Sequence, residues 1–213
     1  MKNKAIHIFF FFVAINIFAV SSSKAQYEFI PDPTTGKPLT ASRYENVTGT
    51  PYLIDAWLTG EVKLANGSIV KPKSIKYDAV DDKLLFLQDG KPFEFFPKVA
   101  MFKLNAQDQI RTFLINDKNG QYFELLVDGD VKLLKKTTKV VLERKGYNSA
   151  TIEKVIDENI KYFILVNDNQ SEVKLNRKAL IKALPNYKSQ IDAFPVSDGD
   201  AESVYVNLIK SLR

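Results

Sequence analysis

The spacing of hydrophobic residues changes three times along the 213-residue chain. An apolar run fills most of residues 5–20, and a polar stretch rich in proline follows it. Short apolar runs separated by turn residues occupy residues 52–174, whereas after Leu175 the apolar positions recur every three or four residues. Short runs between turn residues predict strands and a period near 3.6 predicts helices, so the pattern indicates a β-rich chain with a helical C-terminal end.

Residues 1–25 have the layout of a secretory signal peptide. Lys2 and Lys4 give a positive start, the apolar run follows, and Ser23 and Ala25 place small side chains at the two positions that a signal peptidase reads. A retained membrane anchor is the alternative, but the run is shorter than the ~20 apolar residues that a spanning helix needs. We therefore expect an exported protein that is cleaved after Ala25 and has no transmembrane segment after cleavage.

Residues 26–50 are predicted to form an extended N-terminal arm. The stretch is polar, contains Pro31, Pro33 and Pro38, and shows no sustained hydrophobic period. Prolines of this density break helices and strands. We expect the arm to lie along the surface of the following domain in a structural role rather than to act as a binding motif.

Residues 51–175 are predicted to form an antiparallel β domain. Asn66-Gly67 and Asp89-Gly90 each separate two apolar runs, and such a dipeptide is the strongest short signal for a hairpin. Regularly spaced short strands indicate an antiparallel sheet, a sandwich or a half-barrel. The predicted strands are 61–64, 68–70, 83–88, 91–95, 99–104, 110–115, 122–127, 131–134, 138–142, 161–166 and 171–175. One short helix is predicted among them at 149–159, with Ile152, Val155 and Ile156 at helical spacing and Ser149 as its cap.

Residues 176–213 are predicted to form a helical tail packed on the β domain. Pro185 and Pro195 divide the tail into three parts, because proline ends a helix. The predicted N-terminal caps are Asn176 and one of Ser197, Asp198 and Asp200. The fold class predicted for the whole chain is therefore β-rich α+β, with a C-terminal helical tail.

Two residue types are missing from the expected mature chain. The sequence has no cysteine, and its only histidine, His7, lies in the predicted signal peptide. Catalysis by serine or cysteine with a histidine base is therefore excluded within one mature chain, and so are ordinary zinc sites. We predict no catalytic residue, no metal site and no cofactor.

The charge balance gives little support for nucleic acid as a partner. Removal of residues 1–25 takes away three lysines and no acidic residue, which lowers the formal net charge from +5 to +2. Binding to a nucleic-acid backbone needs a concentrated positive surface.

The acidic clusters at 81–82, 128–130 and 198–202 lack the spacing of a calcium loop, and we expect them to form turns and helix caps.

Positive charge is concentrated in the segment 132–145, where Glu143 is the single acidic residue. If the segment belongs to a hairpin, several of these charges share one face and suit an anionic lipid headgroup or an acidic glycan. Solvated strand faces and lysines that guard a sheet edge give the same pattern. The candidate binding residues are Lys132, Lys135, Lys136, Lys139, Arg144, Lys145 and the only tryptophan, Trp57.

Aromatic residues are a second candidate feature. They either line a pocket for an apolar ligand or form an ordinary core, because the same pattern serves both. The residues concerned are Phe93, Phe95, Phe96, Phe102, Tyr52, Trp57 and Tyr77.

Two stretches carry a resemblance to known proteins. The first is Gly49-Thr50-Pro51-Tyr52-Leu53 with Trp57 and Gly60 after it, and the second is Tyr122-Phe123-Glu124-Leu125-Leu126-Val127-Asp128-Gly129, followed by the basic segment and the helical tail. Both resemble a group of small exported proteins of Bacteroidota-type Gram-negative bacteria. The resemblance spans most of the mature chain and implies a periplasmic or outer-membrane-associated setting, but it brings no activity with it.

These observations favour a non-enzymatic exported envelope protein that binds a protein partner, an anionic surface or a ligand. One alternative is a periplasmic carrier of an apolar ligand, which needs a cavity behind the aromatic residues 93–102. The other is a carboxylate-dependent glycan hydrolase, which needs two carboxylates about 5–10 Å apart across an open cleft.

Overall fold

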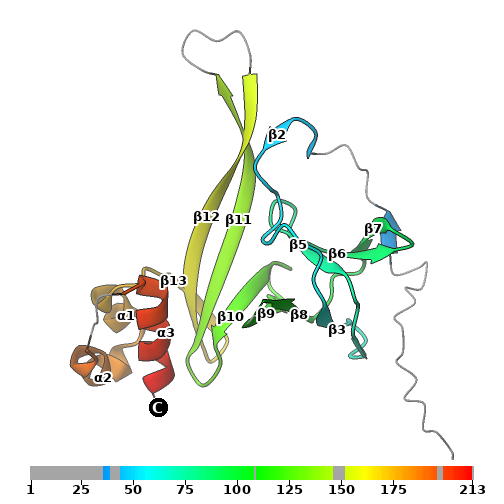
Figure 1. Cartoon of the computed structure of the whole chain (residues 1–213). Helices are drawn as coiled ribbons and strands as arrows, with labels where there is room; N and C mark the ends of the chain where they lie inside the picture. The colour runs from blue at the N-terminus through cyan, green and yellow to red at the C-terminus, as the bar shows by residue number, and fades with distance from the viewer. Residues whose placement is uncertain (1–35, 39–43, 108, 146–151, 196–198, 213) are drawn as a thin grey trace, which may run out of the picture.

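A computed structural model describes residues 36–38, 44–107, 109–145, 152–195 and 199–212. These residues form two β-sheets and a group of helices near the C-terminus, as Figure 1 shows. The predicted signal peptide and most of the arm lie outside the described residues. The β-rich α+β class and the helical C-terminal segment are confirmed.

The smaller sheet has four antiparallel strands in the order β1-β7-β6-β5. Its central hairpin is the one that Asp89-Gly90 predicts, and both of its strands have the predicted bounds. The strands are β1 (Gly36–Pro38), β5 (Ile75–Asp78), β6 (Lys83–Gln88) and β7 (Lys91–Phe95).

The larger sheet has nine strands in the order β13-β12-β11-β10-β9-β8-β3-β4, and β2 pairs with β12 outside this path. All pairs are antiparallel except β2 with β12, which is parallel. The hairpin predicted at Asn66-Gly67 is present as the pair of β3 and β4. The strands are β2 (Val47–Thr48), β3 (Gly60–Lys63), β4 (Ile69–Val70), β8 (Met101–Ala106), β9 (Gln109–Ile115), β10 (Tyr122–Val127), β11 (Lys132–Lys145), β12 (Ile152–Val166) and β13 (Asn169–Val173).

Two predictions for this sheet are wrong. Segments 131–134 and 138–142 form a single strand, β11, because the polar residues between them continue the pairing with β12. The helix predicted at 149–159 is contradicted for its described part, which is the first half of β12. Ile152, Ile156 and Ile160 are separated by even numbers of residues, so they also fit one face of a strand, and β-branched side chains favour that state.

The helical tail follows the prediction closely. The helices are α1 (Arg177–Ala183), η2 (Pro185–Tyr187), α2 (Lys188–Ala193) and α3 (Ala201–Ser211). The Asn176 side chain accepts a hydrogen bond from the N–H of Ala179, and the Asp200 side chain accepts one from Ser203. Both predicted caps therefore begin a helix, as side-chain oxygens at this position do.

The structure has two hydrophobic cores, and both lie on one face of the larger sheet. In the first core the smaller sheet packs against β3, β8, β9 and the start of β10, where Tyr122 is buried. Glu124 lies on the same face and opposite Lys135. Lys135 and Leu133 are two residues apart in β11 and therefore lie on the same face. Leu133 pairs with Ile164, and both belong to the second core under the helices.

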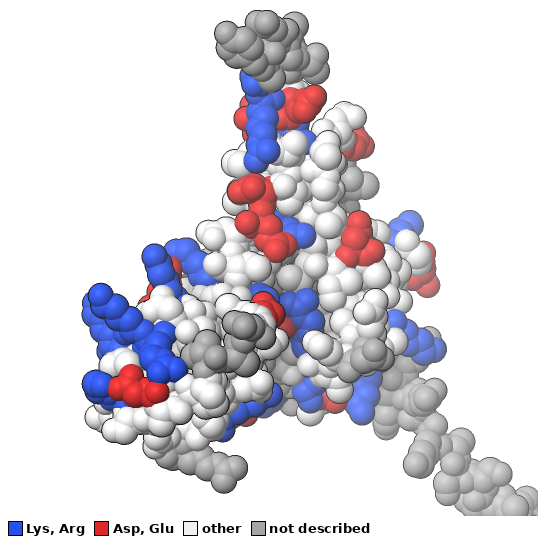
Figure 2. Space-filling model, turned by 60° about the vertical axis from the view of Figure 1, so that its left-hand side comes forward, with Lys and Arg blue, Asp and Glu red and all other residues white. Residues whose placement is uncertain are grey.

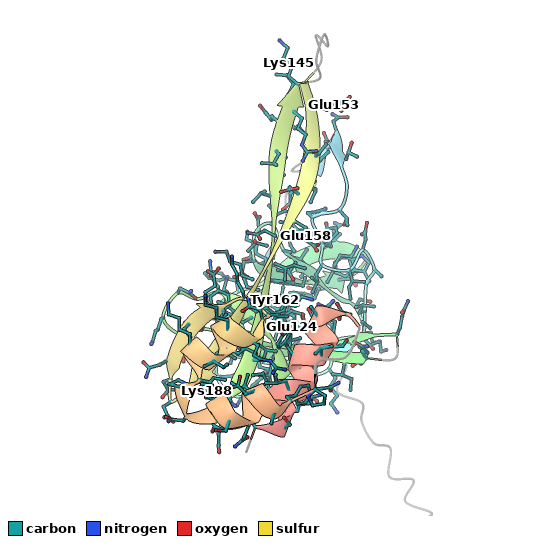
Figure 3. All side chains as sticks on the ribbon, turned by 90° about the vertical axis from the view of Figure 1, so that its left-hand side faces the viewer. Glu124, Lys145, Glu153, Glu158, Tyr162 and Lys188 are labelled. Carbon is teal, nitrogen blue, oxygen red and sulfur yellow. The ribbon has the colours of Figure 1, made fainter. Side chains whose placement is uncertain are left out.

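A band of polar side chains separates the two cores on this face. Arg111 makes two hydrogen bonds to the Glu124 carboxylate, of 2.6 and 2.5 Å. Glu202 of α3 accepts hydrogen bonds from Lys135 Nζ and from the Tyr162 hydroxyl, both at 2.6 Å. Figure 3 shows Glu124 and Tyr162 beside the helices. The two hydrogen bonds to Glu202 fix α3 on the sheet.

Candidate binding site on the β11–β12 hairpin

The strands β11 and β12 form a hairpin that extends well beyond the rest of the molecule (Figure 1). They pair without interruption from Lys132 and Leu165 at the base to Lys145 and Ile152 at the upper end. The lower part belongs to the large sheet, but β10 pairs with β11 only as far as Lys135. From Lys136 onward β11 has left the sheet, and this upper part of the hairpin is the candidate site.

Lys136 fills the gap where β10 and β11 separate. Its side chain is only 7% exposed, and its ammonium group donates to the Tyr122 carbonyl at 2.9 Å and to the Asp82 carboxylate. Asp82 also accepts hydrogen bonds from Lys98 Nζ and the Tyr77 hydroxyl, both at 2.6 Å. This ionic cluster joins the turn after β5 to the base of the hairpin.

The charges in this cluster change the pKa values of its members. Burial alone raises the pKa of Asp82, but the ammonium groups of Lys136 and Lys98 outweigh it and hold the pKa below its ordinary value. Burial lowers the pKa of Lys136, and Asp82 opposes that shift. Burial and the neighbouring Asp82 charge raise the pKa of Tyr77, so its hydroxyl remains a donor. Asp82 is therefore ionised in the folded protein, and its negative charge balances the buried ammonium group of Lys136.

The described end of the arm fastens the hairpin from one side. Lys139 Nζ donates to the carbonyl groups of Thr50 and Tyr52, at 3.1 and 2.7 Å. Gly49 lies against Ile156, where an added Cβ would be 3.1 Å from the Ile156 Cβ, and its φ of +101° favours glycine. Together with the pairing of β2 and β12, these contacts make residues 44–52 a strap across the hairpin.

Around the strap contact at Lys154 and Val155, apolar side chains of the hairpin are exposed on both of its faces. Val140 and Leu142 lie on one face, and Val141, Ile152 and Ile160 lie on the other, as the alternation of a strand requires. Their exposed fractions run from 37% for Val141 to 57% for Ile152. A cavity of about 370 Å³ lies at the foot of this region, between the strap, Val80 and β11.

The upper hairpin also has an open strand edge. The Lys139 N–H points away from β12 and donates to the Ala79 carbonyl at 3.0 Å. Beyond that bond no described strand pairs with this edge of β11. Because backbone groups alternate in direction, the N–H and C=O groups of Val141 and Glu143 point the same way as those of Lys139. This edge therefore presents a row of backbone donors and acceptors.

The basic residues of 132–145 do not form one positive face. Lys132, Lys135 and Lys136 pair with Asp128, Glu202 and Asp82 respectively, and Lys139 is 3.5 Å from Glu158. Arg144 lies 3.7 Å from Asp157 on the exposed upper hairpin. Figure 2 shows positive and negative side chains intermingled there, whereas the helices are more uniformly positive. These ion pairs give no support to the alternative of a shared basic face, because most of the charges have an acidic partner within the fold.

Trp57 belongs to a separate cluster at the smaller sheet. Lys76 Nζ lies 5.1 Å from the Trp57 ring and 4.3 Å from the Tyr52 ring, and it forms a 3.0 Å ion pair with Asp55. The Lys76 side chain is 9% exposed, so the space between the two rings is already occupied by a cation of the same chain.

The predicted aromatic pocket is a packed core. Phe86 stacks on Phe93 with ring centroids 5.7 Å apart and contacts Phe95 at a tilt, at 4.6 Å. Phe102 stacks on Phe113 at 4.6 Å. Phe102 is fully buried. The alternative that the sequence left open, a phenylalanine core, is what the structure shows.

The described acidic residues have structural roles at the three predicted clusters. Asp82 is in the ionic cluster, Asp128 accepts the Gly129 N–H, and Asp200 caps α3. Among the residues that the structure describes, no group of three or more acidic side chains is arranged to hold a metal ion. Nor does any described helix have the length and apolarity that a membrane crossing requires.

Comparison of the chain with protein-family models, with curated proteins and with solved structures finds no match. The resemblance to small exported proteins of Bacteroidota-type bacteria therefore stays a prediction. The Gly49-Thr50-Pro51-Tyr52 motif nevertheless has a structural explanation, because the strap needs Gly49 against Ile156 and the Thr50 and Tyr52 carbonyl groups for Lys139.

Proposed function

We propose that this protein is a non-enzymatic binding protein of the cell envelope that captures an extended segment of another envelope protein on the β11 edge of the hairpin. The observation that carries the proposal is the open edge of β11 above Lys139, flanked by exposed apolar side chains. A strand added there continues the ladder that the Ala79 carbonyl begins. Strand addition of this kind takes affinity from backbone hydrogen bonds and specificity from alternate side chains.

The exposure of this edge supports a binding role. A long exposed strand edge with apolar side chains invites unwanted pairing, and folded proteins usually block such edges. Here β2 pairs with part of the β12 edge, whereas no described strand pairs with the upper β11 edge. An isolated two-stranded hairpin is also marginally stable, so an added strand would stabilise the upper part.

The chemistry of the upper hairpin favours a protein partner over an anionic surface. Arg144, Lys145 and Lys154 are balanced there by Glu143, Glu153, Asp157 and Glu158. A surface with mixed charges has no net attraction for anionic lipid or acidic glycan. Its charges suit a partner segment of similarly mixed character instead.

Export is part of the proposal and rests on the sequence of residues 1–25. The periplasmic or outer-membrane-associated location rests on the resemblance described above. Neither depends on the hairpin, so each is tested separately, by N-terminal sequencing of the mature protein and by cell fractionation.

Photo-crosslinking in intact cells tests the binding site. A benzophenone amino acid at Leu142, which is 38% exposed, is expected to form an adduct with one envelope protein. The same amino acid at Lys188, on α2 and away from the hairpin, is the control position (Figure 3). If Leu142 yields no adduct beyond those found at Lys188, the proposal is wrong.

A second pair of variants tests strand addition itself. Val141→Pro removes a backbone N–H that points away from β12, so the β11–β12 ladder is kept while the open edge is blocked. Val141→Thr keeps both the N–H and the β-branched shape. We expect the Leu142 adduct to disappear in the proline variant and to persist in the threonine variant. Equal adduct yields would show that the partner does not bind as an added strand.

A further inference from the structure

A second pocket lies on the opposite face of the large sheet from the two cores, and its volume is about 260 Å³. It is located where the turn between β9 and β10 meets the turn between β12 and β13. Its floor consists of the apolar side chains of Leu114, Phe123, Leu134 and Leu165. Its rim is polar and comes from residues 116–118 with Asp168 and Gln170.

The floor is set by strand register. Leu114 lies directly opposite Phe123, and Leu134 lies opposite Phe163 on the next pair. The Phe163 ring packs edge-on to Phe123 with centroids 5.2 Å apart. Phe123 and Leu134 are only 4% and 3% exposed, whereas Leu114 and Leu165 are half-buried, so the floor is apolar and partly open to the pocket.

Hydrogen bonds between the two turns hold the rim in place. Asn116 Nδ2 donates to Gln170 Oε1 at 2.6 Å, and Lys118 Nζ donates to the Asp168 carbonyl at 3.2 Å. The Asn116 side-chain oxygen accepts the Lys118 N–H at 2.8 Å. The opening of the pocket is therefore preformed.

Size and charge limit what this pocket takes. An apolar cavity of about 150 Å³ is enough to bind benzene, so the pocket has room for one ring and a short chain. Asp117 and Asp168 are exposed at the rim, where Lys118 is the one basic lining residue and already bonds to the Asp168 carbonyl. Lys136 Nζ lies 5.6 Å from the Phe123 ring, but its charge is paired with Asp82. The rim thus has a net negative charge and favours a cationic group beside the apolar one.

We infer that this pocket is a binding site for a small amine that carries one apolar ring, with the ring on the Phe123 floor and the ammonium group at the Asp117 and Asp168 rim. The site lies on the other face of the sheet from the strap and does not depend on the partner proposed for the hairpin. It requires only side chains of the two turns and of the five strands β9 to β13.

NMR titration of the isotope-labelled protein with 2-phenylethylamine tests the inference. A ligand of this size is expected to bind with a Kd on the order of 1 mM. The amide signals that shift are expected to be those of residues 114–118 and 168–170. The matched control is 3-phenylpropanoate, which has the same ring and chain but a negative charge, and we expect it to bind several-fold more weakly.

Two variants separate the roles of floor and rim. Asp168→Asn keeps the side-chain shape in the left-handed turn, where the φ of Asp168 is 62°, and is expected to weaken amine binding about three-fold. Leu165→Trp fills the floor and is expected to weaken both ligands at least ten-fold, provided that the rest of the spectrum stays unchanged. A series of amines with larger rings gives the same size test without any substitution.

Three outcomes would overturn the inference. They are equal affinity for the amine and the carboxylate, shifted signals that lie outside the two turns, and binding that Asp168→Asn and Leu165→Trp both leave unchanged. None of them bears on the hairpin, because the photo-crosslinking experiment uses residues of the other site.

Discussion

Asp82 has a role far larger than its place in a surface turn indicates. Its backbone is in the left-handed region, with a φ of 56°, which short polar residues tolerate. That conformation turns the carboxylate inward toward Lys136, Lys98 and Tyr77. One side chain therefore joins the smaller sheet to the base of the hairpin.

Asp82→Asn is expected to lower the free energy of unfolding by about 3 kcal/mol, because it leaves the Lys136 ammonium group buried beside a neutral amide. Asparagine tolerates the same backbone conformation, so the loss reports on the charge and on the one acceptor oxygen that the amide lacks. Chemical denaturation measures it. The matched control is Asp89→Asn, at an exposed turn residue with a φ of 50°, and an equally large loss there would contradict this interpretation.

The difference in stability between the wild type and Asp82→Asn is expected to depend on pH. The folded protein holds the pKa of Asp82 below its unfolded value, so on acidification the unfolded chain takes up the proton first. The stability that Asp82 provides is therefore complete above the ordinary carboxyl pKa and is lost as the pH falls below it. The difference in stability between the wild type and Asp82→Asn is expected to shrink over that range.

Gly60 is required by close packing rather than by a special backbone conformation. A Cβ at this position would lie 2.1 Å from the Lys103 carbonyl oxygen and 2.4 Å from Ile75 Cδ1. Gly60→Ala is therefore expected to lower the free energy of unfolding by about 3 kcal/mol or more. The melting temperature is expected to fall with it. Gly199→Ala, where the nearest atom is 3.8 Å away, is expected to have little effect. Similar melting temperatures for the two variants would refute this explanation.

At the scale of elements, the sequence predicted the turns and helix caps, which depend on neighbouring residues. It did not predict the ion pairs between residues that lie far apart in the chain. Asp89-Gly90 predicts the turn of the β6–β7 hairpin and Asn176 predicts the start of α1, and both predictions are confirmed. The continuity of β11 was missed because Lys135 and Lys136 interrupt its apolar pattern. Their partners, Glu202 and Asp82, lie far away in the sequence, so nothing local shows that these lysines are neutralised.

Lys139 is expected to hold the strap on the hairpin. Lys139→Met removes the donor for the Thr50 and Tyr52 carbonyl groups, and hydrogen bonds to a charged group are worth more than neutral ones. Hydrogen exchange of residues 44–52 is expected to speed up roughly ten-fold. Lys132→Met, which removes only a surface pair with Asp128, is the control and should leave the strap unchanged. Unchanged exchange in Lys139→Met would mean that strand pairing alone fixes the strap.

At the scale of the whole molecule, one sheet serves two cores. The smaller sheet covers one half of its face and the helices cover the other, with the Arg111 to Glu202 polar band between them. Cooperative units of this size commonly open separately. The two halves are therefore expected to differ in local stability although they share β10.

Leu208→Ala tests this division. Leu208 lies on the buried face of α3 and is fully buried, and its truncation is expected to lower the free energy of unfolding by about 2–5 kcal/mol. Hydrogen exchange should then speed up in the helices and β13 before it does in β5, β6 and β7. Phe102→Ala, in the first core, is expected to give the reverse order. Uniform acceleration in both variants would show a single cooperative unit.

The strap also constrains the order in which the chain folds. A hairpin of neighbouring strands forms within about 1–10 μs, so β11 and β12 can pair as soon as both exist. The strap residues are synthesised long before the hairpin. However, β2 has no strand to pair with until Lys154 and Val155 of β12 have been synthesised. Contacts between such distant segments form late, because closing a long loop must come first. Until that step the β12 edge at Lys154 and Val155 is as open as the upper β11 edge, and the nascent protein is then most exposed to pairing with the wrong chain.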